Sequence, residues 1–284
     1  MKIELRANAK INLFLDILAK LPNGYHSLFM VMQSVSLADT VTVQENGEDI
    51  IRLTCSEPAL PTDSKNIAYR AAQAFLAEAG LSGRGVDIHI EKNIPFEAGL
   101  AGGSADGAGV IVGLDRLFGT DMGTQRLCDI GLKIGSDVPF CVVGGTAMVE
   151  GRGERLRKLP DMPECVFVVC KPEFSVSTPE LYKKIDTVAI PLHPDNRAME
   201  TALLAGDLNK IADNVYNVFD PVVTAEHLEL NYIKSICNSY GSLGQQMTGS
   251  GSAVFAIMPS FEYGAVVCNM LKENYSQIFL AKPV

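Results

Sequence analysis

The sequence lacks the features of a membrane, secreted or nucleic-acid-binding protein. No apolar run in its 284 residues approaches the roughly 18 residues that a membrane-spanning helix needs. The first six residues alternate like a strand and contain no signal-peptide core, which predicts a cytoplasmic protein. Acidic residues (33) outnumber basic ones (24), giving a net charge of -9. Because no basic surface is expected, nucleic acid is a poor partner, and an anionic substrate would be held locally by loops, helix ends and a few lysines.

Metal-binding motifs are also missing. Neither C-x-x-C nor H-E-x-x-H occurs, and the seven cysteines, an odd number, are scattered through apolar stretches. They are expected to be reduced residues of the core. Cys165 and Cys170 lie five residues apart on a predicted strand, which places them on opposite faces and argues against a shared metal.

The sequence has neither the P-loop motif nor the dinucleotide fingerprint, but residues 94–108 are rich in glycine. Residues 86–91, just before them, alternate with a period of two, as a half-buried strand does. Gly99, Gly102 and Gly103 are positions where the backbone can take positive φ and no side chain blocks a ligand.

A helix is predicted after these glycines, ending near residue 118 with Gly119 as its stop. Ser104 or Asp106 can cap its N-terminus. Strand, glycine loop and helix start aim backbone N–H groups and the positive helix end at one point, which suits a phosphate. The alternative is a tight turn with small residues for packing. Glycines inside the helix, such as Gly107, indicate close approach of another element.

Two further candidates lie near the N-terminus. The odd positions from Ile3 to Ile17 are apolar, which predicts a long strand with Lys10 and Asn12 side by side on its polar face. The alternative for that pair is a solvated sheet face. A turn at residues 22–24 then delivers Tyr25 and His26, which are either functional or incidental surface residues.

Asp137 and a second glycine loop are the remaining candidates. Asp137 precedes Val138 and Pro139, so it is either the N-cap of a short helix or a carboxylate in an apolar setting that could act as a base. Residues 247–253 form a glycine loop between two predicted strands, and the simplest interpretation is a hairpin connection.

The predicted elements alternate along the chain, without internal repeats or low-complexity tracts. Strands are expected at 30–37, 40–44, 165–170, 243–247, 252–258 and 278–282, and helices at 63–81, 123–134, 178–185, 199–216, 226–240 and 261–272. A domain boundary is expected between residues 158 and 159, within a stretch where charge and proline replace apolar residues. The second half is predicted to be an α+β layer structure.

Taken together, these segments resemble the GHMP kinase superfamily over essentially the whole chain. Residues 92–108 look like its second, phosphate-binding motif, and residues 247–255 look like its third. The segments at 9–13, 23–26, 135–140 and 151–154 are similar to the subfamily that acts on 4-diphosphocytidyl-2-C-methyl-D-erythritol. The resemblance implies an α+β, two-domain GHMP kinase fold. Residues 1–158 would form a ribosomal-protein-S5-domain-2-like ATP-binding domain, residues 159–284 a ferredoxin-like domain, and the active site would lie in the cleft between them.

The same resemblance implies a reaction and residue roles. ATP would phosphorylate the 2-hydroxyl of the methylerythritol moiety in the non-mevalonate route to isoprenoids, with Asp137 as general base and Lys10 as its charged neighbour. Asn12 would sit by the reacting hydroxyl. Tyr25 and Tyr182 would stack on the cytosine ring, and His26 would read its edge.

Phosphate binding is implied for the two glycine motifs, with Mg²⁺ between phosphate oxygens and Ser104 as its protein contact. The residues expected at the ATP phosphates are Pro95, Ala98, Gly99, Leu100, Ala101, Gly102, Gly103, Ser104 and Ala105, and those of the third motif are Gly249, Ser250 and Gly251. Ala98 and Ala101 stand where many members have glycine, and alanine resists positive φ. No obligatory protein partner is evident. The alternatives are a family kinase for another small alcohol and a catalytically silent member that binds nucleotide.

Overall fold

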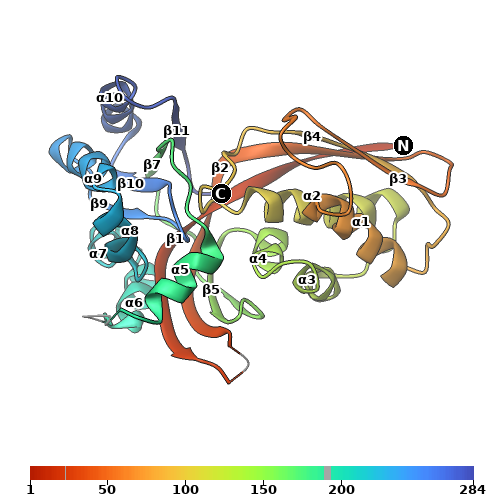
Figure 1. Ribbon diagram of the computed structural model, residues 1–284, viewed down its shortest axis with the longest axis horizontal. Helices are drawn as coiled ribbons and strands as arrows, with labels where there is room; N and C mark the ends of the chain where they lie inside the picture. The colour runs from red at the N-terminus through yellow and green to blue at the C-terminus, as the bar shows by residue number, and fades with distance from the viewer. Residues whose placement is uncertain (23, 189–192) are drawn as a thin grey trace. The chain divides into compact units, whose positions relative to one another are not determined.

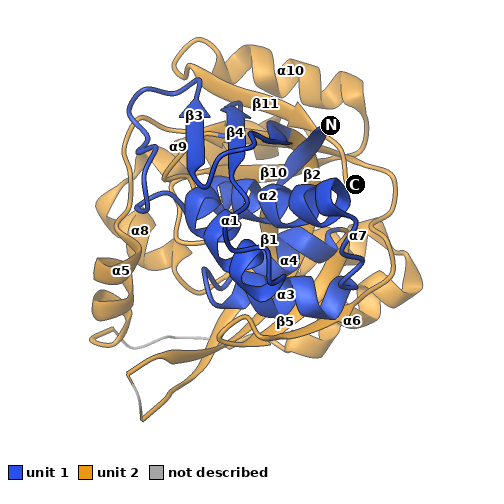
Figure 2. Cartoon of the chain, turned by 90° about the vertical axis from the view of Figure 1, so that its right-hand side faces the viewer, with its two compact units in different colours: residues 1–9, 38–94, 101–144 blue, residues 10–37, 95–100, 145–284 orange. Residues whose placement is uncertain are grey.

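The computed structural model describes residues 1–22, 24–188 and 193–284, which form two compact units (Figure 2). Unit 1 comprises residues 1–9, 38–94 and 101–144, and unit 2 comprises residues 10–37, 95–100 and 145–284. Two long strands near the N-terminus, β1 (Lys2–Lys20) and β2 (His26–Glu45), each supply residues to both units (Figure 1). Each unit is therefore discontinuous in sequence. The expected boundary after residue 158 stays a prediction.

Unit 1 is a sheet covered by helices. The second half of β2 pairs antiparallel with β4, and β3 pairs parallel with β4. The elements it adds are β3 (Ile51–Cys55), α1 (Ile67–Glu78), β4 (Val86–Glu91), α2 (Gly102–Phe118), α3 (Thr124–Leu132) and α4 (Val138–Val143). A Cβ on Gly107 would lie 2.7 Å from Ile67 of α1, and one on Gly109 would lie 3.1 Å from Val41 of β2. The expected close approach at these helix glycines is confirmed.

Unit 2 contains a four-stranded antiparallel sheet in the order β11-β7-β10-β9, packed against α9 and α10. The first half of β2 pairs with β5, β5 pairs with β6, and β8 pairs parallel with β1. The elements it adds are β5 (Thr146–Gly151), β6 (Arg155–Lys158), β7 (Val166–Lys171), α5 (Thr178–Ile185), α6 (Asn196–Ala205), α7 (Leu208–Asp213), β8 (Tyr216–Asn217), α8 (Asp220–Glu226), α9 (Glu229–Ser239), β9 (Gly244–Met247), β10 (Val254–Met258), α10 (Phe261–Leu271) and β11 (Gln277–Ala281).

Several predicted boundaries were wrong for local reasons. Strands expected at 30–37 and 40–44 are one strand, β2. The helix expected from residue 63 begins only at Ile67, because Asn66 caps it by accepting from the backbone N–H of Ala68. The helix expected at 199–216 is two helices, since Gly206 ends α6 in the left-handed conformation and Asp207 caps α7. The predicted turn at 22–24 includes Asn23, which lies outside the described residues.

The cysteine prediction is confirmed in part. All seven cysteines are free, but only Cys165, Cys170, Cys237 and Cys268 are buried, whereas Cys55, Cys128 and Cys141 are half-buried. Burial raises the pKa of the Cys165 and Cys237 thiols to about 12, as expected for inert core residues. In the described ranges, no helix is both long and apolar enough to cross a membrane.

Candidate active site

Lys10 and Asn12 are buried neighbours on β1, with 3% and 1% of their surface exposed. The Lys10 ammonium donates to Asn12 Oδ1 at 2.6 Å and to the Gly99 carbonyl oxygen at 2.9 Å. The backbone N–H of Lys10 also donates to the Leu100 carbonyl, at 3.1 Å. The solvated-face interpretation of this pair is therefore wrong, because the glycine-rich segment covers that face of the strand.

Asn12 has two further buried donors, its backbone N–H and its side-chain Nδ2. Its backbone N–H donates to Thr248 Oγ1 at 3.0 Å, while its side-chain Nδ2 is buried with no hydrogen-bond partner in the described part of the chain. A buried donor left unpaired costs about 1–3 kcal/mol. This amide is thus a candidate donor to a bound ligand.

The two glycine motifs meet within unit 2. A Cβ on Gly99 (φ +75°) would lie 2.1 Å from the Thr248 carbonyl oxygen, and one on Gly249 would lie 2.9 Å from the Gly99 carbonyl oxygen. The backbone N–H of Ala253 donates to the Ala98 carbonyl. The second loop is also a hairpin connection, because β9 and β10 pair antiparallel on either side of it. Only glycine at residues 99 and 249 permits this approach.

Asn217 forms hydrogen bonds with the backbone of the second glycine loop. This fully buried residue of β8 donates from Nδ2 to the carbonyl oxygens of Met247 (2.7 Å) and Gly249 (2.8 Å), and its Oδ1 accepts from the backbone N–H of Phe219. Every polar atom of the side chain is used. An isolated asparagine after a helix gave no signal in the sequence, so its role was missed.

Helix α2 begins earlier than predicted. Its first residue is Gly102 and its N-cap is Ala101, in the left-handed conformation (φ 56°) and without a side-chain cap. Ser104 and Asp106 lie inside the helix, so the prediction that one of them caps it was wrong. Helix starts leave backbone N–H groups without intrahelical partners. The N-cap residue Ala101 supplies no side-chain cap, and Gly103 is exposed, so an anion can reach these groups.

Ser104 and the Asp137 segment lie together in unit 1. A Cβ on Gly135 would lie 3.9 Å from Ser104 Oγ. Asp137 occupies the N-cap position of α4, yet its side chain makes no capping hydrogen bond. Its position matches the capping interpretation, but the bond that would explain the carboxylate on that basis is missing.

A ring cluster surrounds His26 in unit 2. The Tyr182 and His26 rings lie 4.9 Å apart at 31°, and Tyr182 meets Phe219 edge-on at 5.0 Å. His26 Nε2 lies 2.8 Å from Asp186 Oδ1. Tyr25, by contrast, is 54% exposed, with the Arg152 guanidinium 3.8 Å from the centre of its ring. Arg152 lies in the segment at 151–154 that carries part of the resemblance, but no role was predicted for it, and Asp186 belongs to no recognised motif.

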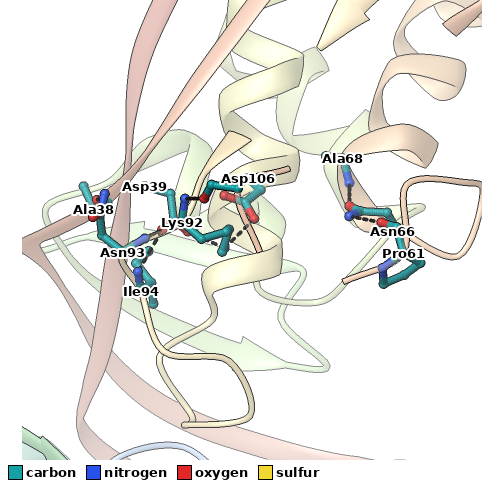
Figure 3. Close-up of polar contacts among 10 residues, drawn as sticks. Ala38, Asp39, Pro61, Asn66, Ala68, Lys92, Asn93, Ile94 and Asp106 are labelled. Carbon is teal, nitrogen blue, oxygen red and sulfur yellow. Dashed lines mark hydrogen bonds and ion pairs between the residues drawn. The ribbon is translucent and has the colours of Figure 1, made fainter. Parts of the chain in front are cut away.

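A buried ion cluster anchors the entrance to the glycine loop in unit 1 (Figure 3). The Lys92 ammonium contacts Asp39 and, at 2.7 Å, Asp106, while Asp39 Oδ1 accepts from the backbone N–H groups of Asn93 and Ile94. Burial raises the pKa of Asp106 to about 7, although Lys92 opposes the rise. The cluster ties β2, the end of β4 and α2 together, and was not predicted from the sequence.

A protein-only metal site is not evident. In residues 1–22, 24–188 and 193–284, no three histidine, cysteine or carboxylate side chains are grouped to hold a metal ion.

Comparisons with known proteins agree with this geometry. The family model of the GHMP kinases N terminal domain matches residues 66–145, and that of the GHMP kinases C terminal matches residues 199–277. The chain is 42% identical to the 4-diphosphocytidyl-2-C-methyl-D-erythritol kinase of Caldicellulosiruptor saccharolyticus, covering 97% of this chain and 95% of the relative. It is 38% identical to the Clostridium acetobutylicum protein of that name, covering 99% and 100%.

Solved structures give the same grouping. A crystal structure of 4-(cytidine 5'-diphospho)-2C-methyl-D-erythritol kinase matches with a TM-score of 0.83 and 30% identity, over 99% of each chain. Homoserine kinase from Cytophaga hutchinsonii matches with a TM-score of 0.79 at 18% identity, over 99% of this chain and 94% of that one, which speaks for the fold alone. The mixed α+β architecture, the glycine motifs and these matches over nearly the whole length have one explanation: the chain belongs to the GHMP kinase family.

Proposed function

We propose that this protein is an ATP-dependent kinase that phosphorylates the 2-hydroxyl of 4-diphosphocytidyl-2-C-methyl-D-erythritol, giving the 2-phosphate and ADP. The reaction belongs to the methylerythritol phosphate route to isoprenoid precursors. One observation carries the assignment: the chain is similar, over nearly its whole length, to kinases named for this substrate. The buried Lys10–Asn12 pair beside the glycine motifs supports it.

The proposed chemistry needs little covalent work from the protein. Phosphoryl transfer depends on positioning and charge neutralisation, because the reacting oxygens must lie in line while negative charge spreads over the phosphoryl group. Asp137 accepts the proton of the attacking hydroxyl. Lys10 stabilises the negative charge that develops on that oxygen. Asn12 donates to the substrate from Nδ2, the amide nitrogen that has no hydrogen-bond partner among the described residues.

The uncapped start of α2 and the glycine loops are proposed to bind the ATP phosphates. Backbone N–H groups and the positive end of the helix favour negative charge there. A magnesium ion would neutralise phosphate charge, with the Ser104 hydroxyl as its protein contact. Tyr25 and Tyr182 stack on the cytosine, which suits an acidic protein because an aromatic face needs no opposite charge.

The test is ADP release with ATP and Mg²⁺, measured with 4-diphosphocytidyl-2-C-methyl-D-erythritol and, in parallel, homoserine, mevalonate and galactose. We expect turnover with the cytidylyl substrate alone. Turnover on another alcohol would leave the family assignment unchanged and would replace the substrate assignment. Absence of turnover on all four, with ATP still bound in calorimetry, would favour a silent nucleotide-binding protein.

A further inference from the structure

Asp186 joins α5 to the ends of β1 and β2. It is the C-cap residue of α5, and its two carboxylate oxygens have different partners: Oδ1 lies 2.8 Å from His26 Nε2, and Oδ2 lies 2.5 Å from Lys20 Nζ. The hydrogen bonds from Lys20 and His26 lower the pKa of Asp186, so the group is a carboxylate at neutral pH. A carboxylate can only accept, and His26 Nε2 must therefore carry a proton and donate it.

The proton on Nε2 decides what the other ring nitrogen can do. A neutral imidazole has one N–H donor and one acceptor nitrogen, and the hydrogen bond made by the first nitrogen selects the form. In the neutral ring, with Nε2–H donated to Asp186, Nδ1 is the acceptor. Lys20 contacts the other oxygen of Asp186, so the carboxylate has two partners, one on each oxygen.

The ring is also fixed in orientation. The His26 side chain is only 7% exposed and packs against the Tyr182 ring, which is itself held edge-on by Phe219. Tyr182 and Asp186 are four residues apart at the end of α5, so one helix supplies both the aromatic contact and the hydrogen-bond acceptor. The acceptor nitrogen of His26 therefore keeps a set direction.

We infer that Asp186 is a specificity-determining positioning residue, which fixes the proton of His26 on Nε2 so that Nδ1 accepts from the amino group of cytosine and repels uracil. The inference rests on the proposed function and names the determinant of its base preference. Cytosine presents an amino donor at the position where uracil presents a carbonyl acceptor. An acceptor nitrogen satisfies the first and leaves the second unpaired, which is how a polar site rejects a near-identical ligand.

The variant that tests this is Asp186→Asn, which keeps the shape but can either donate to Nε2 or accept from it. The proton of His26 is then no longer assigned to one nitrogen. Glu180→Gln is the matched control, because Glu180 is an exposed acid on the same helix and the change in charge is the same. The readouts are kcat/KM with the cytidylyl substrate and its uridylyl analogue, and calorimetric Kd for CDP and UDP.

We expect the cytidylyl preference to fall at least about tenfold in Asp186→Asn, the scale of one hydrogen bond, and to be unchanged in Glu180→Gln. Nitrogen-15 spectra of the neutral His26 ring should show the proton on Nε2 in the wild type and a mixture of the Nε2–H and Nδ1–H forms in the variant. Thermal melts with a common midpoint would show that both variants are folded.

An unchanged preference in Asp186→Asn, an equal fall in Glu180→Gln, or a wild-type proton on Nδ1 would each overturn the inference. Failure of the proposed function looks different, because the wild type would then turn over no cytidylyl substrate. The CDP-to-UDP affinity ratio and the ring spectra would still decide the role of Asp186 in that case.

Discussion

The Lys10 ammonium donates to the side-chain oxygen of Asn12 from two residues away on the same strand, at 2.6 Å. This bond settles which end of the Asn12 amide is oxygen, because an ammonium can only donate. The amide nitrogen of Asn12 therefore has a fixed direction as well. Lys10 and Asn12 act as one unit, in which the lysine both carries charge and orients a neighbouring donor.

Replacing Lys10 with methionine tests this unit. Lys10→Met removes the charge and frees the Asn12 amide to turn, so we expect kcat to fall by at least about 10²-fold, the scale of losing one preorganised charge-stabilising donor. Lys65→Met, at an exposed position before α1, is the control and should keep full activity. Near-normal kcat in a folded Lys10→Met protein would contradict the assigned role.

Asp137→Asn separates a base from a helix cap. Asparagine caps helices as well as aspartate does, so stability should change little, and ATP affinity should stay near that of the wild type. Loss of the proposed general base should lower kcat by at least about 10²-fold. Steady-state kinetics and a thermal melt check both parts. Near-wild-type turnover in this variant would show that Asp137 serves only as the N-cap residue of α4.

Gly99→Ala tests the contact between the two glycine loops. The new Cβ would lie 2.1 Å from the Thr248 carbonyl oxygen at a φ of +75°, so the loops must separate and ATP binding should weaken at least about tenfold. Gly119→Ala is the matched control, with φ +60° and no atom within 4 Å of the added Cβ. Equal effects of the two variants on ATP affinity would show that backbone strain alone is responsible.

Asp106→Asn should make stability less dependent on pH. The pKa of Asp106 is raised to about 7 by burial, against about 3.9 in an unfolded chain, so the folded protein holds this proton more tightly. The stabilisation is complete below the unfolded value and is lost as pH rises through about 7. The Tm of the wild type should therefore fall relative to that of the variant between about pH 5 and about pH 8. Asp129 is an exposed acid on α3, and Asp129→Asn should keep the pH dependence of the wild type. If the Tm of the wild type instead rises relative to that of Asp106→Asn over this range, the Lys92 contact keeps Asp106 ionised.

Tyr25→Ala should raise KM for the cytidylyl substrate and leave the fold intact. The ring is 54% exposed, so its removal costs little stability, while a base-stacking contact is worth roughly 1–3 kcal/mol. KM should rise by about tenfold or more, with kcat less affected. Tyr263→Ala, on α10 with 53% exposure, is the control. Identical KM values for the wild type and Tyr25→Ala would remove Tyr25 from the base site.

Local patterns in the sequence predicted most elements and the two glycine motifs. Alternation identified β1 and β4, and helical spacing with a following glycine identified α2 and its end at Gly119. Boundaries failed where one side chain decided them, as with Asn66 before α1 and Asp207 before α7. Several polar residues near the start of each helix could serve as its N-cap, and only the folded backbone decides which one does.

The missed residues share a physical reason. Asn217, Asp186 and Asp39 each act on a segment distant in sequence: the loop at 247–249, His26 and the start of the segment at 93–94. No local spacing marks such contacts, because they exist only after the sheets have formed. The buried state of Lys10 and Asn12 was missed for the same reason, since the covering segment comes from residues 99–100.

The contact between Asn12 and Thr248 has a consequence for the order of folding during synthesis. The bond joins residues 236 positions apart, and residues 36 and 282 are joined by a similar pair of bonds. Residues 10–20 of β1, which belong to unit 2, therefore lack this hydrogen-bond partner until nearly the whole chain has left the ribosome. Nascent chains stalled before residue 248 should therefore lack the finished site.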